Sequence, residues 1–374
     1  MDRQHVSPRV SALRPYSPGK PIEDVKRELG ITGEIIKLAS NENPLGPCPA
    51  SVQAVHDRLM SAHMYPDAAC IDLAEVIAEK LGVATNQLVF GNGSDECIHL
   101  LGLSFLEEGD EVVTGQPTFV LYEAAATLAG AKRIGVPLTE GDLRHDATAM
   151  VNAFTDKTRL VFIANPHNPT GSIISKSDVD YILEHLPARA YLVLDEAYVD
   201  YIDPESDFPF AIDYIKAGKP VISLRTFSKL YGLAGFRVGY AVAAPDVIAS
   251  MQKPRSPFNV NILAQTAAIA ASSDNDFVAA SKKVNADGMS QLTVGAEALG
   301  MSVVPSHANF ILIDTKRPCR DVYDYILRDG VIVRTGEIFG LPTMLRVTIG
   351  TESQNAKFLD ALKSASEKVL PVCG

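Results

Sequence analysis

The sequence lacks the features that would mark it as a nucleic-acid-binding or membrane protein. It contains no lysine- or arginine-rich run and carries a net charge of −11, so it offers no electrostatic footprint for nucleic acid. No apolar run reaches membrane-spanning length, and residues 1–5 are too polar to open a signal-peptide core. We therefore expect a cytoplasmic protein that binds neither nucleic acid nor membrane.

Cysteine is scarce, and its pattern argues against two further classes of site. The five cysteines are scattered, odd in number and without a C-x-x-C pair, which favours reduced thiols over a disulfide framework or a zinc site. We expect no metal. What remains is an ordinary globular composition, with 47% hydrophobic and 21% charged residues. The 374 residues are enough for two domains.

Short apolar strands alternate with helices through much of the chain. The strands are expected at 88–90, 111–114, 132–136, 160–164, 191–195, 221–225 and 238–242. The helices are expected at 50–62, 70–81, 94–105, 119–129, 146–153 and 176–186. This rhythm indicates an α/β fold with a mostly parallel sheet covered on both faces, in which ligands bind at the carboxyl ends of the strands.

The two ends of the chain differ from this pattern. Residues 1–30 contain several prolines and are typical of an extended arm, and 40–47 form a polar loop that could line a pocket. Residues 260–299 are largely helical and rich in alanine. A smaller unit then follows, with strands at 309–313, 331–334 and 345–349 and helices at 320–328 and 352–369.

The most distinctive chemistry lies in the stretch 226–237, which follows the apolar strand. It presents Thr226, Ser228 and Lys229 at the strand end, and Arg237 eight residues after the lysine. The hydroxyls and the guanidinium can hold a phosphate. Lys229 can form a Schiff base if a nearby cation such as Arg237 keeps its amine partly neutral. The alternative is an exposed lysine in a polar loop.

A second phosphate-binding element is predicted where the strand at 88–90 runs into a Gly-Asn-Gly-Ser-Asp-Glu turn. Gly93 precedes a helix that begins near Ser94 and Asp95. Glycines let the backbone approach an anion, and the free N–H groups of the first helical turn point at it. The alternative is a tight turn with an Asp or Ser cap.

Two further motifs place polar side chains after neighbouring strands. The turn Asn-Pro-His-Asn-Pro-Thr-Gly at 165–171 puts Asn168 at a strand end, and we assign His167 no role beyond local hydrogen bonding. Asp195 ends a wholly apolar strand and precedes Tyr198. An isolated buried charge is very unfavourable, so the carboxylate needs a partner, such as a protonated ring nitrogen. The alternative is a helix cap.

A Schiff-base lysine, a carboxylate for a ring nitrogen and a phosphate cradle together meet the requirements of pyridoxal 5'-phosphate. On these motifs the sequence resembles the fold-type-I aminotransferases, and within them the histidinol-phosphate aminotransferase family, from Arg14-Pro15-Tyr16 to the Leu-Arg-Val at 345–347. The resemblance implies a large domain with a mostly parallel seven-stranded sheet and a small α+β domain. We assign 1–48 to an arm and part of the small domain, 49–270 to the large domain and 271–374 to the small one.

The resemblance also implies roles at the cofactor ring. Lys229 would carry the cofactor and move a proton, and Asp195 would pair with the pyridine nitrogen. Tyr198 and Asn168 would bond the phenolic oxygen. Phe119 would stack on the ring, where many relatives have tyrosine.

The cofactor phosphate would be held by a larger set, namely Gly93, Ser94, Asp95, Thr226, Ser228 and Arg237. Tyr65, in the turn Met-Tyr-Pro-Asp, would reach the cofactor phosphate of a neighbouring subunit. The resemblance therefore implies a homodimer with shared active sites.

For the substrate, the resemblance implies Tyr16 and Asn43 over the pocket and Arg334 and Arg346 from the small domain. Arg346 interrupts an apolar strand, which favours a binding role over a solvated strand end. The implied reaction converts L-histidinol phosphate and 2-oxoglutarate to imidazole acetol phosphate and L-glutamate, in histidine biosynthesis. The alternatives are an aromatic amino acid aminotransferase, a threonine-phosphate decarboxylase and, more weakly, a ligand-binding regulator.

Overall fold

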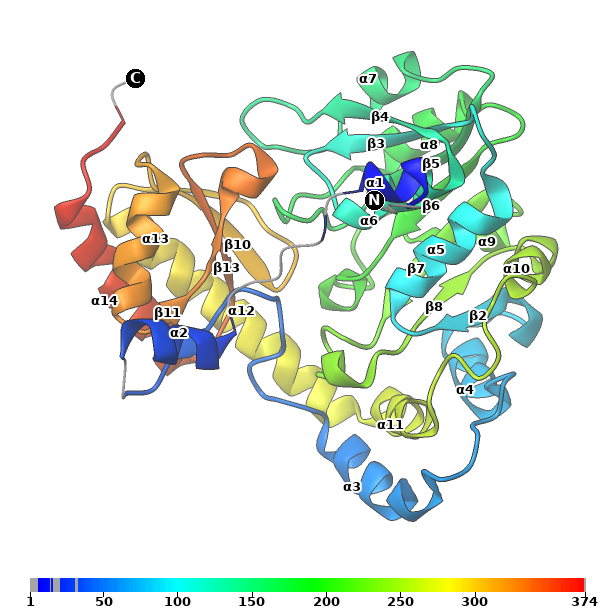
Figure 1. The fold of residues 1–374 in the computed structure, drawn as a ribbon, viewed down its shortest axis with the longest axis horizontal. Coiled ribbons are helices and arrows are strands. Elements are labelled where there is room, and N and C mark those ends of the chain that lie inside the picture. Colours follow the sequence, from blue (N-terminus) through cyan, green and yellow to red (C-terminus); the bar gives the residue numbers. More distant parts are fainter. Residues whose placement is uncertain (1–5, 14, 16–20, 31–32, 373–374) are drawn as a thin grey trace, which may run out of the picture.

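The computed structural model describes residues 6–13, 15, 21–30 and 33–372, and it is built on a seven-stranded sheet (Figure 1). From edge to edge the strands are β2 (Leu88–Gly91), β8 (Gly239–Val242), β7 (Val221–Thr226), β6 (Tyr191–Asp195), β5 (Thr158–Ala164), β3 (Glu111–Gln116) and β4 (Lys132–Pro137). β8 is antiparallel to both neighbours, and the other pairs are parallel. The predicted α/β fold with a mostly parallel sheet is confirmed.

Both faces of this sheet are buried because its strands are apolar at consecutive positions. In β6, Leu192 and Leu194 join the hydrophobic core on one face, and Val193 joins the core on the other. The Val193 face is covered by α5 (Ser94–Phe105), α6 (Val120–Ala129) and α10 (Pro245–Gln252). The opposite face is covered by α4 (Ile71–Leu81), α7 (Ala147–Asn152), α8 (Lys176–Glu184), α9 (Ala211–Lys216) and α11 (Ile262–Ser273). Because helices cover both faces, we expect ligands to bind at the ends of the strands.

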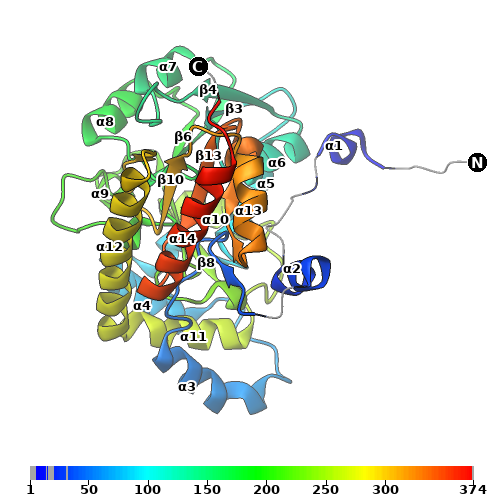
Figure 2. The ribbon, with the colours of Figure 1, turned by 90° about the vertical axis from the view of Figure 1, so that its left-hand side faces the viewer.

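A smaller unit contains two further sheets. An antiparallel sheet has the order β12 (Arg334–Thr335), β13 (Met344–Thr348), β10 (Phe310–Asp314) and β9 (Ser302–Val304). β1 (Ile36–Lys37) pairs in parallel with β11 (Val331–Ile332). The helices of this unit are α2 (Ile22–Leu29), α13 (Cys319–Arg328) and α14 (Glu352–Lys368), and Figure 2 shows α14 between α12 and α13. Its core includes Val25 and Leu38, so residues before 48 belong partly to this unit.

The helix α12 (Asn275–Ala298) joins the two units (Figure 1). Phe277 near its start packs in the large-unit core, and Leu292 and Ala296 near its end pack in the small-unit core. The helical stretch expected at 260–299 is broken at Asp274, whose side chain accepts a hydrogen bond from the backbone N–H of Phe277. This N-cap starts a new helix, so α11 and α12 are separate.

The strand expected at 331–334 also divides, because β11 and β12 pair with different partners on either side of Val333. Two short helices complete the α elements: α1 (Pro8–Ser11) packs on α6, and α3 (Pro49–Arg58) packs on α11. The 3₁₀ helices are η1 (Leu59–Ser61), η2 (Thr85–Gln87), η3 (Val199–Tyr201), η4 (Ala234–Phe236) and η5 (Gly336–Phe339). Within the described ranges, no helix combines the length and the apolar character needed to cross a membrane.

Candidate active site

Most of the predicted site residues meet in one cavity of about 640 Å³, between the carboxyl ends of β5 to β7 and the small unit. Those that line it are Ser94, Asp95, Phe119, Asn168, Asp195, Tyr198, Thr226, Ser228, Lys229, Arg237, Arg334 and Arg346. Pro15 and residues 39–42 of the N-terminal part also line it. Motifs that are far apart in sequence converge here because β5, β6 and β7 are neighbours in the sheet.

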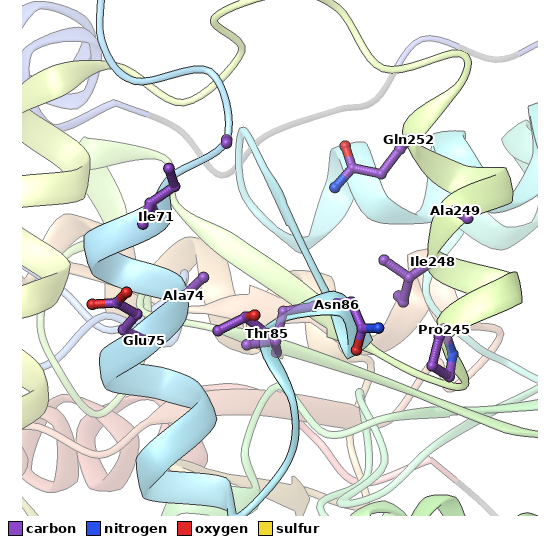
Figure 3. Close-up of a pocket in the computed structure, with 11 residues that line it drawn as sticks. Ile71, Ala74, Glu75, Thr85, Asn86, Pro245, Ile248, Ala249 and Gln252 are labelled. Carbon is purple, nitrogen blue, oxygen red and sulfur yellow. The ribbon is translucent and has the colours of Figure 1, made fainter.

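A second hollow, of about 460 Å³, lies between α4, η2 and α10 (Figure 3). Its lining consists of Ala69, Ile71, Ala74, Glu75, Thr85, Asn86, Leu88, Pro245, Ile248, Ala249 and Gln252. Among these described residues, Glu75 is the only charged side chain. The hollow therefore offers neither a basic group for an anion nor a nucleophile, and the chemistry belongs to the larger cavity.

Lys229 follows β7 and projects into the larger cavity. Its Nζ donates to the backbone oxygen of Ser40 over 3.3 Å and lies 5.6 Å from the ring centre of Tyr198. Burial lowers the pKa of Lys229 to about 8, and the positive charge of Arg346 adds to the effect. Arg346 lowers the pKa of Lys229 more than Arg237 does, although the sequence had pointed to Arg237. With this pKa, about a tenth of the amine is neutral at pH 7, far more than for an ordinary lysine, and the neutral form is the one that attacks a carbonyl.

Asp195 ends β6 and is only 6% exposed. Its Oδ2 accepts a hydrogen bond from the Tyr122 hydroxyl over 2.6 Å, and its Oδ1 accepts one from the Ala197 backbone N–H over 3.2 Å. Burial raises the pKa of Asp195 to about 6, although both hydrogen bonds oppose the shift. A carboxylate in this position is stabilised by a cationic partner, and a protonated ring nitrogen in the cavity would supply one.

A phosphate cradle forms where α5 begins. Gly93 has a φ of 78°, and a Cβ added there would lie 2.6 Å from Nη2 of Arg237. Arg237 is itself left-handed, with a φ of 57°, and its Nη2 donates to Oδ2 of Asp95 over 3.0 Å. A Cβ on Gly239 would lie 2.4 Å from the backbone nitrogen of Ser94. Glycine is therefore needed at both positions for the guanidinium and the helix start to converge on one anion site.

Two buried hydroxyls lie on the same side of the cavity. Thr226 Oγ1 donates to Ser228 Oγ over 2.9 Å, and the Ser228 backbone N–H donates to Thr226 Oγ1. Both residues line the cavity together with Arg237. The geometry thus gathers hydroxyls, a guanidinium and a helix N-terminus, which is the donor set that a phosphate monoester takes.

Tyr198 and Asn168 also line the cavity, where Tyr198 contacts the N-terminal loop and Asn168 contacts the small unit. The Tyr198 hydroxyl accepts a hydrogen bond from Asn41 Nδ2 over 2.9 Å, and burial raises the pKa of Tyr198. Arg346 donates from Nη1 to Asn168 Oδ1 over 2.6 Å and from Nη2 to the Ala39 carbonyl over 2.9 Å. Side chains from both units therefore form a continuous wall.

Arg334 and Arg346 face each other across β12 and β13 as register partners. Residues directly opposite in an antiparallel pair leave the same face of the sheet, and like charges there are mutually unfavourable. The guanidinium of Arg346 also packs against the rings of Phe310 and Phe339, with centroid distances of 5.4 and 5.7 Å. Two arginines on one face beside a cavity indicate a site for an anionic ligand.

Of the predicted site residues that the structure describes, Gly93, Asn43 and Tyr65 do not line this cavity. The Nδ2 of Asn43 donates to the Leu230 carbonyl and to Ser281 Oγ over 2.7 and 2.8 Å, so this side chain anchors the loop. Its place at the cavity is taken by Asn41. Tyr65 is 81% exposed and stacks on Phe258 at 4.6 Å. Tyr16 lies outside the described residues.

Sequence reasoning missed two groups that touch predicted site residues, Tyr122 and Asn41. Asn41 sits in the polar loop that was expected to line a pocket, so its position carried a signal. Tyr122 sits in an ordinary helical pattern and carried none. His167 is fully buried, and its Nδ1 lies 2.9 Å from Thr170 Oγ1, which agrees with the expected local hydrogen bonding.

Glu196, next to Asp195, is a structural group rather than a second acid. It is 1% exposed and accepts hydrogen bonds from the Ala211 backbone N–H, Ser223 Oγ and Arg225 Nε. Arg225 lies on β7 and forms an ion pair with Glu196 over 3.0 Å. The pair fixes the end of β6 against β7, and therefore Asp195 against Lys229.

The residues of the cavity fit pyridoxal 5'-phosphate. A lysine with a lowered pKa suits the aldehyde, a buried carboxylate suits the ring nitrogen, and the glycine-lined cradle suits the phosphate. The lysine follows β7, the carboxylate ends β6 and the cradle lies at the start of α5.

Comparisons with known proteins agree with this fit. The family model for class I and II aminotransferases matches residues 33–362. The chain is 49% identical to a histidinol-phosphate aminotransferase of Moorella thermoacetica, covering 95% of this chain and 91% of that protein, and 43% identical to one of Brevibacillus brevis, covering 93% and 94%. Among solved structures, the histidinol-phosphate aminotransferase of Sinorhizobium meliloti in complex with pyridoxal-5'-phosphate is similar, with a TM-score of 0.89, 27% identity and 98% of both chains covered.

Proposed function

This chain belongs to the family of class I and II aminotransferases, and we propose that it uses pyridoxal 5'-phosphate to transfer the amino group of L-histidinol phosphate to 2-oxoglutarate. The products are imidazole acetol phosphate and L-glutamate, which places the enzyme in histidine biosynthesis. The family match and the names of the similar proteins support this reaction. The single structural observation that carries it is the pair of arginines on one face beside the cavity.

The cofactor, when bound, supplies an electron sink for amine transfer. Lys229 would hold it covalently and move a proton, which its lowered pKa permits. Asp195 would hold the proton on the ring nitrogen. Tyr198 and Asn168 would bond the phenolic oxygen, and Phe119 would cover the ring face. The phosphate would lie among Gly93, Ser94, Asp95, Thr226, Ser228 and Arg237.

Arg334 and Arg346 would bind the phosphate of the donor. A phosphate monoester carries about −1.5 to −2 charges at neutral pH, and the protein is acidic overall, so a doubly charged substrate needs a local cationic patch. The register of β12 and β13 supplies that patch at the small-unit wall. The same guanidinium fork can accept the carboxylate of 2-oxoglutarate, because both anions offer paired oxygens.

Steady-state kinetics of the purified protein with 2-oxoglutarate test this assignment. L-Histidinol phosphate should give a higher kcat/KM than phenylalanine or tyrosine. A higher kcat/KM for an unphosphorylated aromatic amino acid would instead identify an aromatic amino acid aminotransferase. Release of carbon dioxide from threonine phosphate would identify a decarboxylase.

We further propose a homodimer in which Tyr65 reaches the cofactor phosphate of the partner. Five exposed apolar side chains between residues 59 and 71 support this: Leu59, Met60, Met64, Tyr65 and Ile71 are 52%, 86%, 49%, 81% and 55% exposed. Large apolar groups clustered on a surface mark an interaction site. If these side chains are buried in a subunit interface, Tyr65 of one subunit would reach the cavity of the other.

We also propose a cytoplasmic location and a division of the chain into three segments. A cytoplasmic location is supported by the four described cysteines, which are free and buried. The division into 1–48, 49–270 and 271–374 is supported by separate hydrophobic cores on the large and small sheets, although Phe277 of the third segment packs in the large core.

A further inference from the structure

We propose that Tyr122 is a positioning residue for Asp195: its hydroxyl holds the carboxylate in one orientation, with the remaining lone pairs directed to the cofactor's ring nitrogen. This inference rests on the proposed role of Asp195 at that nitrogen. It adds a residue outside the sequence motifs, 73 positions away from Asp195 along the chain.

The contact is short and buried. Tyr122 is fully buried on α6, and its hydroxyl lies 2.6 Å from Asp195 Oδ2. The other oxygen, Oδ1, accepts only the longer bond from the Ala197 backbone N–H at 3.2 Å. Over the described ranges, Tyr122 is the one side chain that donates a hydrogen bond to this carboxylate.

The ring of Tyr122 is held in place by its aromatic neighbours. It stacks on Phe162 with a centroid distance of 4.5 Å and an interplanar angle of 14°, and meets Phe119 edge-on at 5.8 Å and 81°. Such pairs have defined geometry, so the hydroxyl cannot turn away from Asp195 without breaking both contacts. Phe119 is the residue expected to cover the cofactor ring, so Tyr122 supports two walls of one subsite.

Nearby negative charges oppose ionisation of Asp195, and the Tyr122 hydroxyl counteracts them. The ionisable groups that act on Asp195 electrostatically include Asp95 and Cys97 of α5, Glu196 and Tyr198 of the following turn, and Tyr122 of α6. The cation Lys229 lines the same cavity. Asp95 and Glu196 raise the pKa of Asp195, and Tyr122 lowers it. The pKa of Tyr122 is itself well above its usual value because of burial, so the hydroxyl keeps its proton and always donates.

Tyr122→Phe tests the role, because it removes the hydroxyl and keeps the stacked ring. We expect kcat to fall about tenfold or more with a smaller change in KM, since loss of a hydrogen bond to a charged group is of that order. The acid limb of the pH–rate profile should move to higher pH by about one unit. The apoprotein should bind pyridoxal phosphate more weakly in a fluorescence titration, and the pH dependence of the bound cofactor's visible absorbance should shift.

Tyr214→Phe is the matched control. It also removes a tyrosine–aspartate hydrogen bond, from Tyr214 to Asp180 at 2.9 Å, in the same unit but outside the cavity. We expect it to leave kcat, the pH profile and cofactor affinity unchanged. Thermal unfolding of the apoproteins gives a further readout: in Tyr122→Phe the loss of stability as pH rises should extend to higher pH than in wild type.

A double variant decides whether Tyr122 acts through Asp195. On an Asp195→Asn background, Tyr122→Phe should cause little further loss of kcat. Additive losses, or an unchanged pH profile and cofactor affinity in Tyr122→Phe, would overturn the proposal. The cofactor titrations need no amino donor, so a donor other than histidinol phosphate would contradict the proposed function and leave this test intact.

Discussion

Arg346 of β13 donates a hydrogen bond to Asn168 in the turn after β5, over 2.6 Å, and so ties the small unit to the large one across the cavity. Its other terminal nitrogen donates to the Ala39 carbonyl, which adds the N-terminal loop to the same contact. The Arg346 side chain therefore joins β13, the turn after β5 and the N-terminal loop at the place where we expect the substrate anion. An anionic substrate bound there would compete with Asn168 for Arg346.

Replacement of Arg346 by alanine should weaken both half-reactions. The loss of one charged hydrogen-bonding contact corresponds to about 1.5–3 kcal/mol of transition-state stabilisation, or roughly ten- to a hundredfold in kcat/KM. Single-turnover kinetics with histidinol phosphate and with 2-oxoglutarate measure the two halves separately. Arg328→Ala, at an exposed position on α13, is the control and should change neither. A loss confined to one half-reaction would contradict the shared role.

Borohydride should fix the cofactor to Lys229. The lowered pKa of this amine and its position in the cavity support covalent attachment there. Peptide mapping of the reduced holoenzyme identifies the modified lysine. Lys229→Ala should lose transamination by at least about a hundredfold, because the proton-transferring group is absent. Modification of Lys80, whose pKa burial also lowers, would contradict the assignment.

Asp195→Asn should have opposite effects on turnover and on apoprotein stability. The folded pKa of Asp195 is about 6, above its usual 3.8, so its contribution to stability is full below pH 3.8 and is lost as pH rises through 6. In the apoprotein, the difference in unfolding free energy between variant and wild type should grow in the variant's favour across that window, towards roughly 3 kcal/mol.

Turnover of the Asp195→Asn holoenzyme should fall far more than its cofactor affinity, because the carboxylate keeps the ring nitrogen protonated when charge develops. Denaturant unfolding of apoprotein from pH 4 to pH 8 and steady-state kinetics measure the two effects. Asp156→Asn, at an exposed position in a turn, is the control for stability. Equal turnover in variant and wild type would refute the electronic role of Asp195.

Mixing two inactive variants should restore activity if the active sites are shared between subunits. Lys229→Ala lacks the lysine of its own site, and Tyr65→Ala lacks the residue that we expect to reach the partner's site. A heterodimer of the two contains one site with both groups intact. The test requires that Tyr65→Ala be nearly inactive alone. Failure to regain activity despite demonstrated subunit exchange would argue against composite sites.

The amino-acid sequence by itself determined the seven strands of the large sheet, most of the helices that cover it and the positions of the cofactor motifs. It did not predict α1 and α2, which lie where an extended arm was expected. Apolar runs such as that of β6 are buried on both faces wherever they lie in a parallel sheet, so they could be identified locally. Asp195 ends one such run, and Lys229 comes three residues after the end of another. The ends of neighbouring parallel strands meet at one edge of the sheet. These parts of the site needed no tertiary information.

Only the tertiary structure decided which side chains meet. It placed Asn41 rather than Asn43 at the cavity, aligned Arg334 with Arg346, and brought Tyr122 of α6 to Asp195. In a loop, two asparagines at i and i+2 are equivalent in sequence, and the packing of the loop chooses between them. Strand register and helix rotation are likewise set by the burial of whole faces, so the partner of one polar side chain follows from contacts made by many other residues.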